Sequence, residues 1–392
     1  MNKSEDIKII CLSCQTEFMF TVGEQEFYAE RGFAHPKRCP ACCKQMKLAI
    51  DTQKKQAADR EWQLQEDRKI KELLKALPYN RLSLPEVIVD NSSKTLYVIG
   101  NGFDIAHGVP SRYLNFRDSM GKNNNLRRNL ETYLKVDDLW SDFEEALAHI
   151  DGSALLGNVD MWLDLMGAYE PDALAADFCM AYETAAEPAI EIIRKLPVSF
   201  RKWVETLKPL KEPIYKSLLH QGGTYLNFNY TEFLETLYNV PSNNITYIHG
   251  CRTNNKQDLI LGHAFESGDD DDWTPSMPLP KYKSKRKLEM LSAALEGTTR
   301  YLADYMESTT KNTKQIIAEN SKFFEKLPYI ETIVVVGHSL SLVDYPYFRE
   351  IIKYNQNKAN WLITWHSSRD LKSIRKFVGE MSIASNKITL VK

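Results

Sequence analysis

Four cysteines near the start of the chain have the spacing of metal ligands. Cys11 and Cys14 form one CxxC pair, and Cys39 and Cys42 form a second. Two such pairs supply four thiolates that can converge on one tetrahedral zinc ion. Four protein ligands leave no open position for a substrate, so we expect the zinc to be structural. Cys43 lies outside the pattern.

The segment around these cysteines is too short to bury a stable core, and we expect the metal to supply much of its folding energy. Aromatic and β-branched residues between the two pairs, at 18–33, predict a β-hairpin. The succession CxxC, QEFYAERGF and PKRCPAC over residues 11–42 resembles a bacterial family of zinc-ribbon domains. This resemblance implies a binding module and leaves open what is bound.

A long helix is predicted after the cysteines. Residues 44–77 contain no Gly or Pro, are rich in helix formers and stop at Pro78, and an extended linker follows. From Arg31 to Arg81 there are 13 Lys or Arg against 6 Asp or Glu, a local excess of +7. This surface could contact a nucleic acid or a protein, and a solvated helix face is the alternative. We therefore expect a zinc ribbon at 1–45, a connecting helix and linker at 46–93, and a third region at 94–392.

Composition limits the class of protein. The 392 residues carry 50 Lys or Arg and 52 Asp or Glu, so no overall charge favours a polyanionic partner. No run is long enough to span a bilayer, and the first residues lack the apolar core of a signal peptide. These values indicate a cytoplasmic protein without membrane contact and are compatible with a homo-oligomer.

From residue 94 onward, short β-rich runs alternate with helical stretches, which predicts a Rossmann-like parallel sheet covered by helices. A helical insertion is expected at about 115–220. The predicted strands are 95–99, 224–228, 245–248, 258–262, 332–336, 360–364 and 387–391.

Polar residues and glycines follow four of these strands. Strand 95–99 is followed by Gly100, Asn101, Gly102 and Asp104, with Phe103 between them, and strand 332–336 by Gly337, His338 and Ser339. Asn229 follows strand 224–228, and His249 follows strand 245–248. Open α/β sheets bind ligands beyond the carboxyl ends of their strands. Glycines on both sides of Asn101 would let the backbone approach a ligand, and a helix beginning near Phe103 would direct its N–H groups at a phosphate. The pattern predicts a dinucleotide pocket.

These motifs also resemble a known family. LYVIGNGFDIAHGVPSRYLNF (96–116), LWSDFEEAL (139–147), NFNYTEFLETLY (227–238), YIHG (247–250) and VVVGHSLSLVDYPYF (334–348) are similar to the bacteriophage abortive-infection AbiH family. More distantly, their order is similar to that of sirtuin-like NAD-binding domains. Two positions differ, because Thr231 stands where those domains often carry an acidic residue and Asp104 where they carry a serine.

The resemblance implies an anti-phage effector that binds NAD and hydrolyses it. In that hypothesis His249 is the general base and Asn229 positions the sugar or the water. Glu144 would stabilise positive charge on the ribose, and Asp104 would contact a ribose hydroxyl or cap its helix. The expected cofactor contacts are Gly100, Asn101, Gly102, Phe103, Asp104, Gly337, Ser339 and Asp344.

Two alternatives remain open from the sequence. The first is an effector that binds nucleic acid through the zinc ribbon and the basic helix. The second is a defence protein that senses a nucleotide without catalysis. An acidic run at 266–272 and a basic run at 281–287 predict a charged surface loop between the strands.

Overall fold

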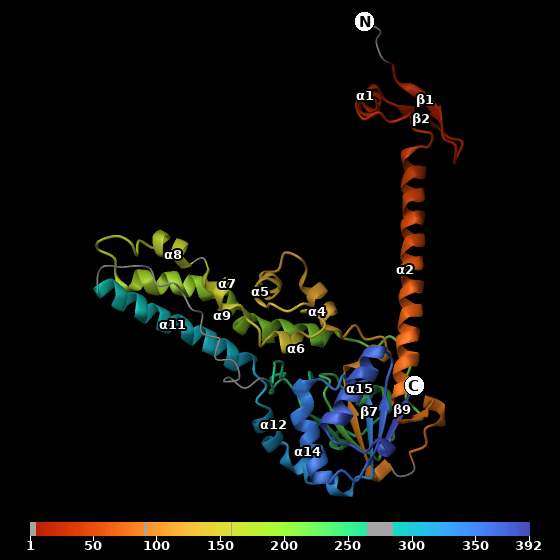
Figure 1. The fold of residues 1–392 in the computed structure, drawn as a ribbon, viewed down its shortest axis with the longest axis vertical. Coiled ribbons are helices and arrows are strands. Elements are labelled where there is room, and N and C mark those ends of the chain that lie inside the picture. The colour runs from red at the N-terminus through yellow and green to blue at the C-terminus, as the bar shows by residue number, and fades with distance from the viewer. Residues whose placement is uncertain (1–4, 90–91, 158, 265–284) are drawn as a thin grey trace. The chain divides into compact units, whose positions relative to one another are not determined.

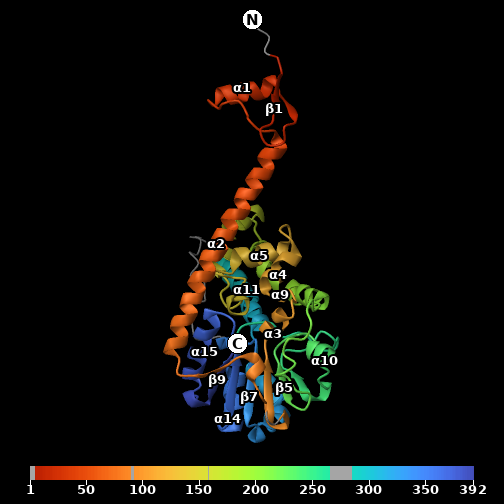
Figure 2. The ribbon, with the colours of Figure 1, turned by 90° about the vertical axis from the view of Figure 1, so that its right-hand side faces the viewer.

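The chain divides into two units, Met1–Ala76 and Leu77–Lys392. The computed structural model describes residues 5–89, 92–157, 159–264 and 285–392. The acidic run at 266–272 and most of the basic run at 281–287 lie outside the described residues. Figures 1 and 2 show the helices and strands of both units.

The first unit holds the cysteines and the long helix. Strands β1 (Ile7–Ile10) and β2 (Glu17–Phe20) pair antiparallel, and helices α1 (Val22–Glu30) and α2 (Pro40–Ala76) follow. The predicted long helix is confirmed, but the hairpin predicted within 18–33 is wrong beyond Phe20. Thr21 and Glu24 form a capping box there, which starts α1 instead of a second strand. No residue of α1 or α2 is buried, so core packing contributes little to this unit.

The second unit is built on a seven-stranded parallel sheet, which confirms the predicted fold class. Its strands are β3 (Asn80–Leu82), β4 (Thr95–Ile99), β5 (Thr224–Asn227), β6 (Ile245–Tyr247), β7 (Thr332–Val336), β8 (Asn360–Thr364) and β9 (Ile388–Val391). They lie in the order β3-β9-β8-β7-β4-β5-β6. Apart from β3, this is the Rossmann order 3-2-1-4-5-6, read from β6. The strand order therefore reverses between β4 and β7.

Alternate residues of each strand face opposite layers, as the period of two requires. On β4, Tyr97 and Ile99 join a large core shared with the helical insertion, while Leu96 and Val98 are equally buried on the other face. On that second face Phe348 and Phe377 pack near Trp361. Buried on both sides, the strands read as continuous apolar runs, which is why most of them could be predicted.

The helical insertion lies between β4 and β5, as predicted. It contains α4 (Tyr113–Met120), α5 (Asn125–Tyr133), α6 (Phe143–Ala146), α7 (Gly152–Leu156), α8 (Val159–Leu165) and α9 (Ala175–Thr206), after the short α3 (Asn101–Ala106). Helix α11 (Lys285–Thr309) comes later in the chain and packs along α9 (Figure 1). We call the α9 and α11 pair the helical arm.

Shorter helices complete the sheet layers. They are α10 (Phe233–Tyr238), α12 (Thr313–Glu319), α13 (Ser321–Phe324), α14 (Tyr345–Asn355) and α15 (Ser368–Glu380). None of the described helices combines the length and the apolar character that crossing a bilayer demands.

Two predictions about strands need correction. Residues 258–262 form no strand, although Leu259 and Leu261 do pack against the core. Residues 80–82, predicted to be linker, form the edge strand β3 beside β9. All three residues of β3 are exposed, so no local apolar signal marks it as a strand.

Candidate functional site

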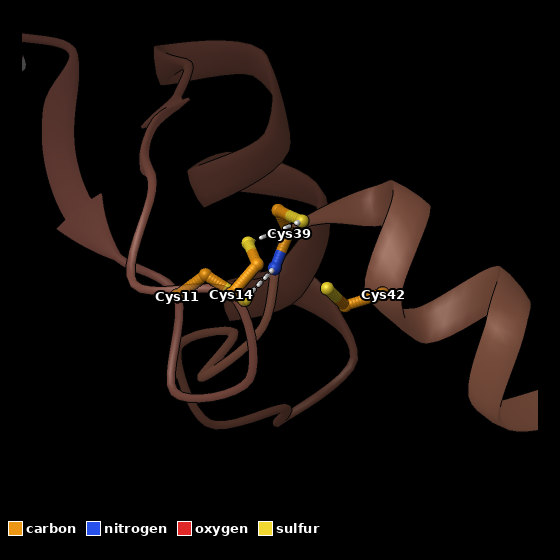
Figure 3. A group of neighbouring side chains, drawn as sticks. All are labelled: Cys11, Cys14, Cys39 and Cys42. Atoms are coloured by element: carbon orange, nitrogen blue, oxygen red, sulfur yellow. Dashed lines mark hydrogen bonds between the residues drawn. The ribbon is translucent and has the colours of Figure 1, made fainter.

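The four cysteines come together in the first unit (Figure 3). Their sulfurs lie within 4.8 Å of one another, and the Sγ atoms of Cys14 and Cys39 are 3.8 Å apart. A tetrahedral zinc ion with Zn–S bonds of about 2.3 Å places its sulfurs about 3.8 Å apart, so this donor set fits zinc. Cys11 and Cys14 lie in the turn between β1 and β2, and Cys42 lies in the first turn of α2.

Hydrogen bonds and charge also favour a cation among these sulfurs. The backbone N–H groups of Ser13 and Cys39 donate to Cys11 Sγ at 3.4 and 3.3 Å. Hydrogen bonds to the sulfurs of Cys39 and Cys14 raise the pKa of Cys42. Four clustered thiolates repel one another, and a bound divalent cation removes that cost. Cys43 Sγ instead points to the backbone carbonyl of Arg38.

In the second unit, two chain segments cross closely where the strand order reverses. Gly102 N donates to Gly337 O at 2.7 Å, and Gly337 has a φ of +61°. A Cβ atom on Gly102 would lie 2.7 Å from Gly337 Cα, and one on Gly100 would lie 2.5 Å from His338 Cα. Backbone packing therefore requires these glycines. Their predicted contact with a pyrophosphate stays a prediction.

Asp104 links the ends of β4 and β5. Its Oδ1 accepts from Asn229 Nδ2 at 2.9 Å, and its Oδ2 accepts from Thr231 Oγ1 at 2.7 Å. Burial raises the pKa of Asp104 to about 7, although these two hydrogen bonds act in the opposite direction. The side chain does not cap α3, for which no side-chain cap bond exists. Asn229 therefore points at Asp104, and the role predicted for it beside His249 stays a prediction.

Two predicted site residues, His249 and Asp344, meet His338 at the carboxyl edge of the sheet. His249 follows β6, His338 follows β7, and Asp344 ends a short 3₁₀ turn before α14. Asp344 Oδ1 lies 3.9 Å from His249 Nε2, and Asp344 Oδ2 lies 3.5 Å from His338 Nε2. Only 3%, 2% and 9% of the three side chains is exposed. This is a buried, polar group at the edge where parallel sheets carry their ligand sites.

The charged part of the same group comes from the insertion and the arm. Lys311 Nζ donates to Glu144 Oε2 at 2.7 Å and lies 3.9 Å from Asp344 Oδ1. Tyr113 OH donates to Glu144 Oε1 at 2.7 Å. The polar cluster, as we call it, therefore consists of His249, His338, Asp344, Lys311 and Glu144.

Burial sets the protonation of this cluster. Burial, with Lys311 nearby, keeps the pKa of His249 well below its usual value and lowers that of His338 to about 3, so both rings are neutral at pH 7. Burial raises the pKa of Asp344, and Lys311 opposes this. Leu340 N donates to His338 Nδ1 at 2.9 Å, which leaves the ring proton on Nε2, toward Asp344.

Several buried polar atoms of this cluster have no hydrogen-bond partner among the described residues. They are His249 Nε2, Asp344 Oδ1 and, next to them, Tyr347 OH. The His249 ring already bonds the backbone of Phe228 through its other nitrogen, so Nε2 presents a lone pair. Two acceptors 3.9 Å apart can each accept a hydrogen bond from the same water molecule, or from one of two neighbouring hydroxyl groups. The two acceptors are therefore placed to receive hydrogen bonds from one water molecule or from sugar hydroxyls.

The remaining predicted residues lie elsewhere. Ser339 is exposed, and Phe103 is buried among His107, Tyr215 and Tyr238. The Asn101 side chain exchanges hydrogen bonds with Ser111. Sequence reasoning missed Lys311 because a lone lysine after a helix is ordinarily a surface residue.

A cavity of about 530 Å³ opens at the opposite, amino edge of the sheet. It is lined by Ser92, Lys216, His220 and Gly222 among others, which precede or flank the beginnings of β4 and β5. Parallel sheets rarely bind ligands at that edge. We therefore take the polar cluster as the candidate site.

Two family models match the chain. A model described as bacteriophage abortive infection AbiH matches residues 96–365, which is more than half of the chain. A model described as a probable treble clef domain matches residues 5–49. That description suits the module, whose second cysteine pair lies at the start of a helix. Searches of curated proteins and of solved structures found no match.

Proposed function

The chain belongs to the bacteriophage abortive infection AbiH family, and we propose that its second unit acts in this defence by binding NAD and hydrolysing it. The cysteine module of the first unit (residues 5–42) would hold a structural zinc ion and bind a nucleic acid or a protein partner.

One observation carries the proposal of hydrolysis. His249 Nε2 and Asp344 Oδ1 are both buried acceptors, lie 3.9 Å apart and lack a hydrogen-bond partner among the described residues. An unpaired buried acceptor costs free energy, so a pair of them indicates a site shaped for a molecule that donates to both. A water molecule held there is next to a neutral imidazole that can accept its proton.

The proposed reaction follows from this geometry. The water oxygen forms a bond to C1′ of the nicotinamide ribose, and the bond from C1′ to the pyridinium nitrogen breaks. The electrons of that bond neutralise the departing nicotinamide, and the water proton passes to His249 Nε2. Asp344 lies beside the imidazolium that forms and stabilises its charge. Glu144, hydrogen-bonded to Lys311, is the carboxylate that we propose for the oxocarbenium ion. The products are nicotinamide, ADP-ribose and one proton.

The strand order of the second unit supports a dinucleotide as the ligand. The second unit has the Rossmann strand order, and the polar cluster lies on the edge where that fold binds dinucleotides. The motif order that resembles sirtuin-like domains favours NAD within that class. Gly337, which follows β7, and Gly100 and Gly102, which follow β4, are proposed cofactor contacts at the reversal of strand order.

The test measures nicotinamide released from NAD by the purified full-length chain. We expect release, and we expect His249→Ala to lower it by about 10²–10⁴, the usual contribution of a general base. His366→Ala is the matched control, because His366 is an exposed histidine of the same unit, and it should keep the parental rate. NAD that is bound but stays intact would contradict hydrolysis and favour the sensing alternative. Equal rates in both variants would contradict the role of His249.

A further inference from the structure

Lys311 is a buried cation that the proposed reaction does not use. Its side chain is 0% exposed, and within the described part of the chain its Nζ makes one hydrogen bond, to Glu144. A lysine is almost never buried fully without a partner, and here the hydrogen-bonded partner is Glu144, while the nearest oxygen of Asp344 lies 3.9 Å from Nζ. The ammonium has three donors, and this contact occupies one of them.

The helical arm determines where Lys311 lies. Helix α11 ends at Thr309, two residues before it. His263 N donates to Thr309 O at 2.8 Å, and Lys311 N donates to His263 O at 2.6 Å. A Cβ on Gly262 would come within 2.1 Å of Thr309 O, so the two backbones touch. Lys311 is thus held by main-chain pairing at the end of the arm.

Asp344 is surrounded by groups from several elements. The charged and titratable ones are Lys311 after α11, Glu144 on α6, His249 after β6, His338 after β7, Tyr113 on α4, and Tyr230 and Tyr347 beside the cluster. Among these groups only Lys311 carries a positive charge at neutral pH, since both histidines are neutral.

We infer that Lys311 is a positioning residue that keeps the Asp344 carboxylate ionised and thereby makes its Oδ1 an acceptor beside His249. This inference rests on the proposed function for its catalytic meaning. A carboxyl group buried to this degree is neutral without a nearby cation, and a protonated Asp344 could not stabilise the imidazolium. The arm therefore supplies the charge that the sheet edge needs.

The direct test reads the protonation of Asp344 in the full-length chain. Aspartate carboxyl carbons are labelled with ¹³C, and the Asp344 resonance is identified by its loss in Asp344→Asn. We expect Lys311→Met to raise the apparent pKa of Asp344 by about 1–3 units, the effect of removing an opposite charge at this distance. Lys314→Met, on an exposed position of α12, is the control and should leave it unchanged. An unmoved Asp344 titration in Lys311→Met would overturn the inference.

Lys311→Met leaves the half-buried Glu144 without its cation, so the variant could fail to fold. Lys311→Met combined with Glu144→Gln removes both charges of the pair and should still raise the apparent pKa of Asp344. Gly262→Ala alters no side chain of the cluster, yet its Cβ would displace the segment that carries Lys311, and the same direction of shift is expected. An unchanged apparent pKa of Asp344 in the double variant or in Gly262→Ala would again overturn the inference.

Turnover separates this inference from the proposed function. If NAD is hydrolysed, the acid limb of the pH–rate profile should move upward in Lys311→Met by the same amount as the Asp344 titration, with KM little changed. If the parent releases no nicotinamide, the proposed function fails, while the carboxyl titration still decides the role of Lys311. A fall in thermal stability with both readouts unmoved is the signature of a merely structural lysine.

Discussion

The cysteine module and the polar cluster differ in how their residues are held in place. In the module, four ligands lie within 32 residues and no helix residue is buried, so the site must hold the fold together. In the second unit, the fold is held by a large apolar core, and the cluster draws on residues from 144 to 344. The ligands of a site that stabilises its own fold can be recognised from their spacing in the sequence. The residues of a site that a larger fold assembles come from distant segments and show no such spacing.

The largest effect should come from breaking the module. Cys39→Ser removes one of four zinc ligands, and structural zinc is worth about 10–16 kcal/mol in comparable small domains, so the module should lose its metal and its fold. Elemental analysis should fall from one zinc per chain to none, and limited proteolysis should cut within residues 5–42. The second unit should keep its thermal transition.

Cys43→Ser is the matched control for that experiment. Its sulfur points to a backbone carbonyl and lies outside the cluster, so the zinc content should stay at one per chain. Zinc retained at full content in Cys39→Ser would contradict the proposed ligand set.

The next largest effect concerns Asp104, a buried carboxyl of the second unit. Its pKa is raised from 3.8 to about 7, so the folded state binds more protons than the unfolded state between these values. Its contribution to stability is therefore present below pH 3.8 and is lost as pH rises through about 7, a loss of roughly 4 kcal/mol. Asp104→Asn does not titrate, so the parent should lose stability relative to it across this range. Denaturant unfolding at a series of pH values measures the difference, and parallel curves would contradict the burial argument.

The smallest effect concerns the crossing of Gly102 and Gly337. Gly102→Ala places a Cβ 2.7 Å from a backbone atom and should cost about 1–3 kcal/mol of unfolding free energy. Gly379→Ala is the control, because it lies in α15 with nothing within 4 Å of the added atom, and it should be neutral or slightly stabilising. Equal unfolding free energies for the two variants would show that the crossing tolerates a side chain and that a ligand could approach there.

The fold could largely be predicted from the sequence. Strands such as 95–99 and 332–336 are buried on both faces, and their apolar runs end at glycines. Residues 258–262 carry the same signal but form no strand, because among the described residues their backbone makes one hydrogen bond to another segment, from Ile260 N to His249 O. Strand β3 is the opposite case, because it was predicted to be linker and forms a strand. Its pairing with β9 depends on a segment about 300 residues away in the chain.

The candidate site could be predicted only in part. His249 could be proposed because it follows a strand closely, where a parallel sheet places ligand contacts. His338 has the same signal after β7, but the sequence predicts no role for it. The contact between Asp104 and Asn229 joins two strand ends whose adjacency no local pattern reveals. The position of Lys311 could not be predicted from the sequence, because its burial results from packing between elements and not from its neighbours in sequence.

The hydrolysis of NAD that we propose for the polar cluster should take place during abortive infection. The most direct measurement follows NAD and nicotinamide in infected cultures, using phages that the parent chain restricts, alongside cells that carry His249→Ala or His366→Ala. NAD should fall and nicotinamide should rise on infection with the parent and with His366→Ala, and both the change and the protection should be lost with His249→Ala. Protection by the parent with NAD unchanged throughout infection would contradict the account.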